Sequence, residues 1–188
     1  NYLMSALYLH IPFCKTKCNY CNFYSQASVK HIRAFIPALL HELALRKEEL
    51  GSESVETIYF GGGTPSILSV GDIGSILNQV YKHYSIVTNV EITLEANPEH
   101  LTKDYLIALR QLSVNRLSVG VQSFDDKALQ WLGRTHTASM SANALRLAFE
   151  YGFDNITADL IFGIPEVSVE KDIANFLLFN LPHISAYA

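Results

Sequence analysis

Three cysteines stand close together as Cys14, Cys18 and Cys21, and the chain contains no other cysteine. Thiolate sulfur binds soft metal ions and iron–sulfur clusters, so an odd, tightly spaced set indicates metal chemistry rather than a disulfide framework. Pro12 and Asn19 predict that the segment is a loop. Three thiolates in one loop can bind three irons of a [4Fe–4S] cubane, which leaves the fourth iron open to substrate.

Zinc is the competing interpretation of the same three residues. His10 or His31 would then supply the fourth ligand. Structural zinc sites draw their ligands from two well-separated pairs, and this chain lacks that arrangement. A third interpretation, three unligated buried cysteines, fits poorly with a polar loop that also carries Lys15 and Lys17. The spacing favours the cluster and leaves zinc open.

A glycine triplet, Gly61 to Gly63, follows an expected strand over 55–60 and runs into Thr64 and Pro65. Glycines let backbone groups approach a ligand closely, which favours a ligand contact over an ordinary turn. A phosphate-binding loop is a further interpretation, but the lysine of that motif is missing.

Other polar residues stand where strands are expected to end. Glu95 ends a strand over 90–95, Gln122 follows one over 115–121, and Asp159 lies within one over 156–162. Taken singly, each is explained as a solvated cap or surface residue. Because the carboxyl ends of parallel strands form the active face of α/β folds, we expect these residues and the cysteine loop to share one mouth.

The elements that must position these residues alternate between apolar strands and helical stretches. The remaining strands are expected over 6–11 and 183–187, and helices over 30–50, 70–83, 102–112, two pieces of 125–150, and 168–180. Short connections between six such repeats predict an α/β fold, an open six-stranded parallel (β/α)6 partial TIM barrel. A closed eight-fold barrel needs about 250 residues. A doubly wound sheet is the alternative.

Two residues of the first helical stretch carry specific expectations. Pro37 should kink that helix or reset its start, and Gly51 should cap its carboxyl end. The whole sequence, residues 1–188, is expected to form one domain.

Composition limits the partners and the location. The net charge of −4 lacks the basic excess of a nucleic-acid binder, so no nucleic-acid partner is expected. No run of eighteen apolar residues and no secretory signal are visible, and the cysteines are clustered rather than paired. These features predict a cytoplasmic protein, with membrane association only through partners.

The motifs together resemble those of radical SAM proteins, in the branch of oxygen-independent coproporphyrinogen III oxidase and the haem chaperone HemW. The resemblance covers nearly the whole chain, in the segments 8–23, 61–66, 95–98, 116–124, 132–136, 159–165 and 183–185. It implies a radical SAM core domain over 1–188, with the C-terminal domain of relatives expected to lie outside this sequence. One departure is Glu166-Val167, where the family usually continues Gly-Gln.

The resemblance also implies cofactors and their residues. A [4Fe–4S] cluster on Cys14, Cys18 and Cys21 would bind and reductively cleave S-adenosylmethionine. Gly62 and Gly63 would hold the methionine head, Glu95 the ribose, and Tyr20 would shield the cluster. Gln122, Arg134 and Asp159 would meet a second S-adenosylmethionine or a tetrapyrrole propionate. The full expected S-adenosylmethionine set is Tyr8, Tyr20, Gly62, Gly63, Thr64, Glu95, Gln122, Arg134 and Asp159.

Two functions follow from the resemblance. The preferred one is a haem chaperone that binds haem and delivers it to acceptor proteins. The alternative is the oxidase, which converts coproporphyrinogen III to protoporphyrinogen IX. Phe23 favours the chaperone, because the oxidase type commonly carries a cysteine there, and so does the short segment before Tyr8. Either function implies a reductant such as flavodoxin or ferredoxin. His10 and His136 are more readily explained as structural residues than as haem ligands.

Overall fold

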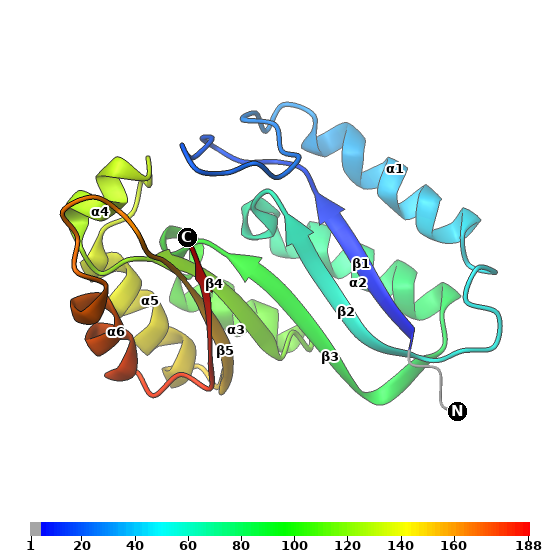
Figure 1. Cartoon of the computed structure of the whole chain (residues 1–188). Coiled ribbons are helices and arrows are strands. Elements are labelled where there is room, and N and C mark those ends of the chain that lie inside the picture. Colours follow the sequence, from blue (N-terminus) through cyan, green and yellow to red (C-terminus); the bar gives the residue numbers. More distant parts are fainter. Residues whose placement is uncertain (1–4) are drawn as a thin grey trace.

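The computed structural model describes residues 5–188, and parallel strands alternate with helices throughout them (Figure 1). The strands are β1 (Ser5–Ile11), β2 (Val55–Gly62), β3 (Ile86–Ala96), β4 (Arg116–Gln122), β5 (Asn155–Ile161) and β6 (His183–Tyr187). The helices are α1 (Ile32–Leu45), α2 (Val70–His83), α3 (Lys103–Gln111), α4 (Asp126–Trp131), α5 (Ala138–Glu150) and α6 (Val169–Leu177), with short 3-10 turns at Pro65–Ile67 and Pro98–His100.

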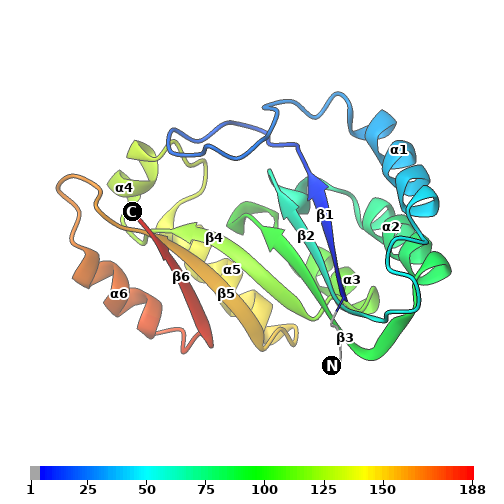
Figure 2. The same cartoon turned by 45° about the vertical axis from the view of Figure 1, so that its right-hand side comes forward.

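The six strands form one parallel sheet in the order β1-β2-β3-β4-β5-β6. Within residues 5–188, β1 and β6 do not pair with each other, so the curved sheet stays open. Figures 1 and 2 show the helices on its outer side. A doubly wound sheet has helices on both faces, so the expected open partial barrel is confirmed.

Alternation along each strand separates two faces of the sheet. Apolar side chains such as Ile58, Leu94 and Leu117 are fully buried beneath the helices. Their neighbours Glu95 and Ser118 are partners in the register between β3 and β4 and belong to the inner face. Burial of the apolar outer set holds the helices against the sheet, and the polar residues of the inner face line the concave side.

Hydroxyl and carboxylate caps define where most helices begin. In each of these, a side-chain oxygen of the N-cap residue accepts a backbone N–H of the first turn, which satisfies a donor that the helix cannot. The caps are Ser69, Thr102, Asp125, Thr137 and Ser168.

The helix α1 differs from the expectation at Pro37 and at Gly51. α1 begins at Ile32 and continues through Pro37, so the proline does not reset its start. The helix ends at Leu45, and Gly51 is not its cap; Gly51 instead closes a later turn, with φ of 57° and its N–H donating to the Glu48 carbonyl at 3.1 Å. Leu45, the last residue of the helix, is 68% exposed.

Among residues 5–188, no helix is both long enough and apolar enough to cross a bilayer.

Candidate functional site

The cysteine loop, residues 12–31, lies across the carboxyl ends of the strands. Its two ends are held together, because Gln26 N–H donates to the Pro12 carbonyl at 2.8 Å and Cys14 N–H donates to the Gln26 carbonyl at 3.0 Å. Its middle is attached to the end of α4 through Asn19, whose side-chain amide donates to the Trp131 carbonyl at 2.9 Å. The loop therefore links β1 to the β4–α4 side of the mouth (Figure 1).

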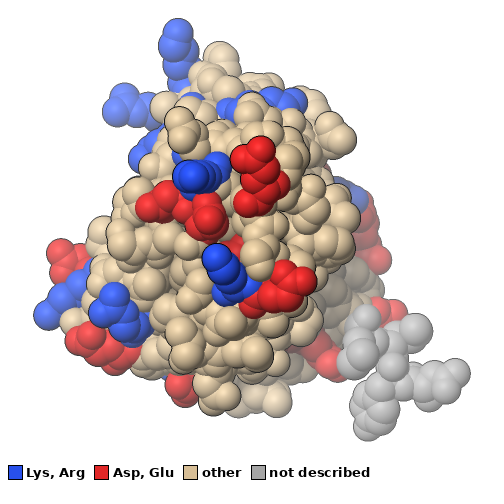
Figure 3. Space-filling model, turned by 60° about the vertical axis from the view of Figure 1, so that its left-hand side comes forward, with Lys and Arg blue, Asp and Glu red and all other residues tan. Residues whose placement is uncertain are grey.

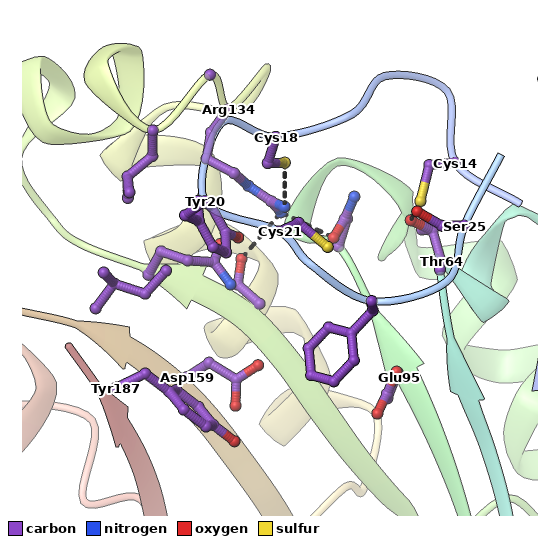
Figure 4. Close-up of a pocket in the computed structure, with 18 of the residues that line it drawn as sticks. Cys14, Cys18, Tyr20, Cys21, Ser25, Thr64, Glu95, Arg134, Asp159 and Tyr187 are labelled. Atoms are coloured by element: carbon purple, nitrogen blue, oxygen red, sulfur yellow. Dashed lines mark hydrogen bonds between the residues drawn. The ribbon is translucent and has the colours of Figure 1, made fainter. Parts of the chain in front are cut away.

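The three thiols line the cavity beneath this loop. Cys14 Sγ accepts a hydrogen bond from Thr64 Oγ1 at 3.4 Å, and Cys18 Sγ accepts one from Arg134 Nη1 at 3.5 Å. Figure 4 shows Cys14 apart from Cys18 and Cys21. In residues 5–188 no three Cys, His, Asp or Glu side chains gather around one ion position. A cubane binds each thiolate on a different iron, which is compatible with cysteines that lie apart.

Both ring nitrogens of His10, one of the two residues that the zinc interpretation names as fourth ligand, lie near other protein groups. Its Nε2 lies 3.0 Å from the Tyr24 carbonyl oxygen and its Nδ1 3.3 Å from the Tyr8 hydroxyl. Among the described residues, the set that lines the cavity includes neither His10 nor His31. The cavity lining contains the three cysteine sulfurs together with carboxylate and imidazole groups, among them Glu95 and His100.

The glycine triplet lets the cysteine loop lie against the end of β2. A Cβ on Gly63 would stand 2.7 Å from the Phe13 carbonyl oxygen and 3.0 Å from Cys14 Sγ. Gly62 has φ of 116°, which favours glycine, and a Cβ there would meet the His10 ring at 2.8 Å. Close approach of two backbones therefore requires Gly63, whereas the positive φ and the adjacent His10 ring require Gly62.

Glu95 presents its carboxylate to the cavity from the end of β3 (Figure 4). It accepts hydrogen bonds from the Tyr59 hydroxyl at 2.8 Å and from Gly62 N–H at 3.0 Å. Burial raises the pKa of Glu95, and these two donors partly oppose that effect. Each carboxylate oxygen retains a lone pair for a further donor, such as a ligand hydroxyl.

Gln122 and Arg134 bring unpartnered polar atoms to the same cavity. Gln122 ends β4 with φ of 62° and is 5% exposed. Arg134 Nη2 donates to Asn97 Oδ1 at 2.8 Å and to the Gly120 carbonyl at 3.2 Å. Within the described chain, Gln122 Oε1 and Arg134 Nε are buried without a hydrogen-bond partner. Such atoms in a cavity indicate a polar ligand.

Asp159 faces the same space from β5 (Figure 4). Burial raises its pKa from 3.8 to about 7, and the nearby Glu95 carboxylate adds to the shift. Two carboxylates that share a cavity disfavour each other's ionised form, so a cation or a hydroxyl donor placed between them is stabilised.

The hydrogen-bond partner of Arg134, Asn97, is itself held by a network around Glu99. Asn97 Nδ2 and Thr135 Oγ1 donate to Glu99 Oε1 at 3.4 and 3.1 Å, and Glu99 Oε2 lies 3.6 Å from Nδ1 of the buried His136. Burial, with the charge of Arg134, lowers the pKa of His136 to about 4. His136 also contacts the Val121 carbonyl at 3.1 Å, which fits a structural role.

The cavity that these residues line has a volume of about 690 Å³, within the usual range for small-molecule sites. It brings together eight of the nine residues expected to bind S-adenosylmethionine and all three cysteines. Tyr8 is the exception: its ring is 59% exposed, stacks on Tyr59 and does not line this cavity. Tyr20, at 37% exposed, lies beside the cysteines.

Several lining residues were not expected from the sequence. They are Tyr59, Asn97, Glu99, His100, Arg116 and Thr157. Arg116 lies among polar groups of the inner face and donates to Thr157 Oγ1 at 2.7 Å. Tyr59, Arg116 and Thr157 had the signal of an inward position on a recognised strand, but strand alternation alone does not separate cavity wall from solvated surface. Asn97, Glu99 and His100 follow β3, in and just before the turn at Pro98–His100, where no alternation applies.

The residues that line the cavity suit a cluster with a polar ligand beside it. Three sulfurs border the cavity, two buried polar atoms lack partners, and the glycine cradle at Gly63 brings backbone against Cys14. These features match a site for a cubane with an exchangeable ligand beside it.

Comparisons with known proteins agree with this geometry. The radical SAM superfamily matches residues 8–177. Heme chaperone HemW of Lactococcus lactis is 36% identical over 98% of this chain and 48% of its own length, and that of Escherichia coli K12 is 37% identical over 97% and 50%. The chain therefore spans about half the length of the curated relatives it matches.

A solved structure resembles the whole described fold. Coproporphyrinogen III oxidase (HemN) from Escherichia coli, described as a radical SAM enzyme, superposes with a TM-score of 0.89 at 28% identity, over 97% of this chain and 44% of that one. The family match over residues 8–177 shows that this chain belongs to the radical SAM superfamily.

Proposed function

We propose that this chain is the radical SAM core of a haem chaperone of the HemW type, which binds haem and delivers it to acceptor proteins. The observation that carries the proposal is the 36–37% identity to heme chaperones HemW over 97–98% of the chain. The oxidase structure is similar in fold but only 28% identical. Phe23, where the oxidase type commonly carries a cysteine, supports the same choice.

Cys14, Cys18 and Cys21 would hold the cluster. When bound, the cluster would supply one electron, which splits one carbon–sulfur bond of S-adenosylmethionine and gives methionine and a 5′-deoxyadenosyl radical. Thr64 and Arg134 donate hydrogen bonds to two of the cysteine sulfurs, which stabilises thiolate charge. Tyr20, which lines the cavity between the second and third cysteines, would limit the access of water.

The chain's own groups would orient S-adenosylmethionine. Backbone groups of Gly62 and Gly63 would bind the methionine head, and the Glu95 carboxylate would accept from the ribose hydroxyls. Arg134 would pair with a carboxylate, and Gln122 Oε1, unpartnered among the described residues, would accept from a ligand donor. Asp159, with its raised pKa, would either donate as an acid or pair with a cationic group.

The cluster is tested by anaerobic reconstitution of residues 1–188. We expect a brown protein with thiolate-to-iron charge-transfer absorbance and about four irons per chain. Cys18→Ser should lose this absorbance, while Asn22→Ala, an exposed change in the same loop, should keep it. A colourless product that contains one zinc ion would contradict the proposal.

The choice between the two functions is tested on the reconstituted chain. Titration with haem should give saturable binding with a shifted Soret band, and incubation with coproporphyrinogen III and S-adenosylmethionine should give no protoporphyrinogen IX. Turnover of coproporphyrinogen III would support the oxidase, which the HemN fold match favours. A chain that retains its cluster yet takes up no haem would contradict the chaperone role of this domain.

A further inference from the structure

Glu95 is held differently from the carboxylates of the outer surface. In the middle and lower part of the face shown in Figure 3, Asp and Glu side chains lie beside Lys and Arg. Within residues 5–188 Glu95 forms no ion pair, and its two hydrogen-bond donors, the Tyr59 hydroxyl at 2.8 Å and Gly62 N–H at 3.0 Å, are both neutral. The orientation of this carboxylate therefore depends on those two donors.

Tyr59 reaches Glu95 along the inner face of the sheet. Tyr59 pairs with Thr93 in the register between β2 and β3. Glu95 lies two residues further along β3, so it is on the same face as Thr93, because side chains alternate along a strand. The phenol ring thus extends beyond its own register partner, and its hydroxyl donates to Glu95 Oε1.

Gly61 leaves the space in which this ring lies. A Cβ there would stand 2.9 Å from Tyr59 Cε1 and 2.8 Å from Tyr8 Cε2. The first glycine of the triplet therefore admits two aromatic side chains at the end of β2, whereas Gly63 admits the cysteine loop. The glycine triplet in this way also makes room for the tyrosine that holds Glu95.

Tyr8 packs against the Tyr59 ring. The two residues are register partners in β1 and β2, and their rings stack with centroids 5.9 Å apart and planes inclined by 24°. The Tyr8 hydroxyl lies 3.3 Å from His10 Nδ1, and His10 Nε2 lies 3.0 Å from the carbonyl oxygen of Tyr24, which belongs to the cysteine loop. A continuous row of contacts therefore joins that loop, through two strands, to the Glu95 carboxylate.

The protonation states of Tyr59 and Glu95 suit a donor and an acceptor. Burial raises the pKa of the Tyr59 hydroxyl, and the Glu95 charge adds to this shift, so the phenol stays protonated and donates. Burial also raises the pKa of Glu95, whereas the hydrogen bonds from Tyr59 and Gly62 lower it and so favour the ionised carboxylate. With one donor on each oxygen, the carboxylate can still accept two neighbouring hydroxyls.

We propose that Tyr59 is a positioning residue: with Tyr8 stacked on it, it holds the Glu95 carboxylate in the orientation that accepts the two ribose hydroxyls of a bound nucleoside. The inference rests on the proposed function, in which Glu95 binds the ribose of S-adenosylmethionine. Tyr59 acts through Glu95 and does not itself need to touch the ligand. Loss of its hydroxyl should therefore weaken recognition of the ribose hydroxyls and leave the rest of the ligand site intact.

The test uses two ligands that differ only in the ribose, S-adenosylhomocysteine and its 2′,3′-dideoxy analogue. Neither is a sulfonium, so calorimetry on the anaerobically reconstituted chain measures binding without cleavage. Tyr59→Phe removes the hydroxyl and keeps the ring. Tyr8→Ala removes the stacking partner, whose ring is 59% exposed. Tyr84→Phe is the matched control, because it removes a hydroxyl that lies outside the cavity and donates to the Leu43 carbonyl at 3.0 Å.

For Tyr59→Phe we expect S-adenosylhomocysteine to bind about tenfold more weakly, because a hydrogen bond to a charged group is lost, and the dideoxy analogue to stay within about twofold of the unmodified chain. Tyr8→Ala should weaken binding of the same ligand by a smaller factor, and Tyr84→Phe should change neither. At unchanged iron content and urea unfolding, an equal loss for both ligands in Tyr59→Phe, or no loss for either, would overturn its positioning role.

The unmodified chain tests the proposed function separately. It should bind S-adenosylhomocysteine at least about tenfold more tightly than the dideoxy analogue, since a site built around a ligand hydroxyl rejects an analogue that lacks it. Equal affinity for the two ligands, or binding of neither, would overturn the ribose contact of Glu95 and the proposed ligand site, and the role of Tyr59 with them.

Discussion

At the scale of single residues, Gly63 shows how closely the cysteine loop and β2 approach each other. A Cβ there would meet backbone atoms of Phe13 at 2.7 and 2.9 Å, and backbone cannot rotate away as a side chain can. Gly63→Ala should therefore displace the loop and reduce iron retention after reconstitution at least twofold. The measurement is iron per chain after gel filtration.

Gly71 provides the matched control for this substitution. Its Cβ would meet only Ser69 Oγ, at 3.7 Å, and it lies in the first turn of α2. Gly71→Ala should leave iron content unchanged and slightly stabilise the helix. Equal iron content in both variants would show that the close approach at Gly63 does not position Cys14.

The raised pKa of Asp159 predicts a pH dependence of folding in the apo chain. Its folded-state pKa of about 7 exceeds the ordinary 3.8, so between these values the folded state holds a proton that the unfolded state releases. The free energy of unfolding should then fall as pH rises from 4 to 7, by up to about 1.4 kcal/mol per pH unit. Asp159→Asn should remove this contribution and raise stability at pH 8 in urea unfolding.

The sign of that dependence separates Asp159 from His136. The pKa of His136 is lowered to about 4, so its contribution to stability is lost as pH falls from 6.5 toward 4. The difference between the chain and its Asp159→Asn variant isolates the carboxyl from the imidazole. Asp154→Asn, at an exposed position, serves as control. Parallel pH profiles for Asp159→Asn and the unmodified chain would contradict the assigned shift.

At the scale of elements, Asp172 ties α6 to the segment that follows β4. It is 3% exposed, and its carboxylate accepts from Ser123 Oγ at 2.6 Å and from Phe124 N–H at 2.7 Å. Asp172→Ala leaves both buried donors unpaired and should cost about 2–4 kcal/mol in urea unfolding. Exposed Glu170, on the same helix, should cost less than about 0.5 kcal/mol when replaced by Ala.

The contact between Asp172 and Ser123 also supports the candidate site indirectly. Ser123 directly follows Gln122, whose φ of 62° is maintained by the structure around it. If Asp172→Ala is no more destabilising than Glu170→Ala, the link between α6 and the end of β4 is not what holds this strained residue.

At the scale of the whole molecule, the proposed ligand contacts span the sheet. Gly62 and Glu95 belong to β2 and β3, whereas Gln122 and Asp159 belong to β4 and β5. A ligand held by both halves binds the folded state alone, so it should stabilise the single unfolding transition. At one hundred times its dissociation constant, S-adenosylmethionine should add about 2.7 kcal/mol, which corresponds to a rise in Tm of roughly 5–10 °C for a chain of this size.

Calorimetry under anaerobic conditions measures this rise in the reconstituted chain. Cys18→Ser, without a cluster, should show a much smaller rise, because part of the binding energy comes from the open iron. An unchanged Tm in the reconstituted chain at saturating S-adenosylmethionine would contradict the assigned ligand contacts.

The sequence by itself determined the order and type of the elements. Alternation over two residues and repetition over three to four residues depend on near neighbours, so six strands and their helices were located within a few residues. The end of α1 was misplaced at Gly51, because the helix ends at Leu45 and a separate turn, closed by the Gly51 N–H on the Glu48 carbonyl, follows it. The strand-end positions of Glu95, Gln122 and Asp159 also predicted a common mouth, and all three line the cavity.

Only the tertiary structure decided how the mouth is built. Arg134 contacts Cys18, which lies 116 positions away in the chain, and Asn97, which lies 37 positions away. Tyr8 was expected in the cavity and lies outside it, whereas Arg116 was not expected and lines it. The curvature of the sheet decides these positions, and no local sequence pattern encodes that curvature. Local periodicity specifies which face a residue takes, but contacts between distant segments decide which polar groups are buried together.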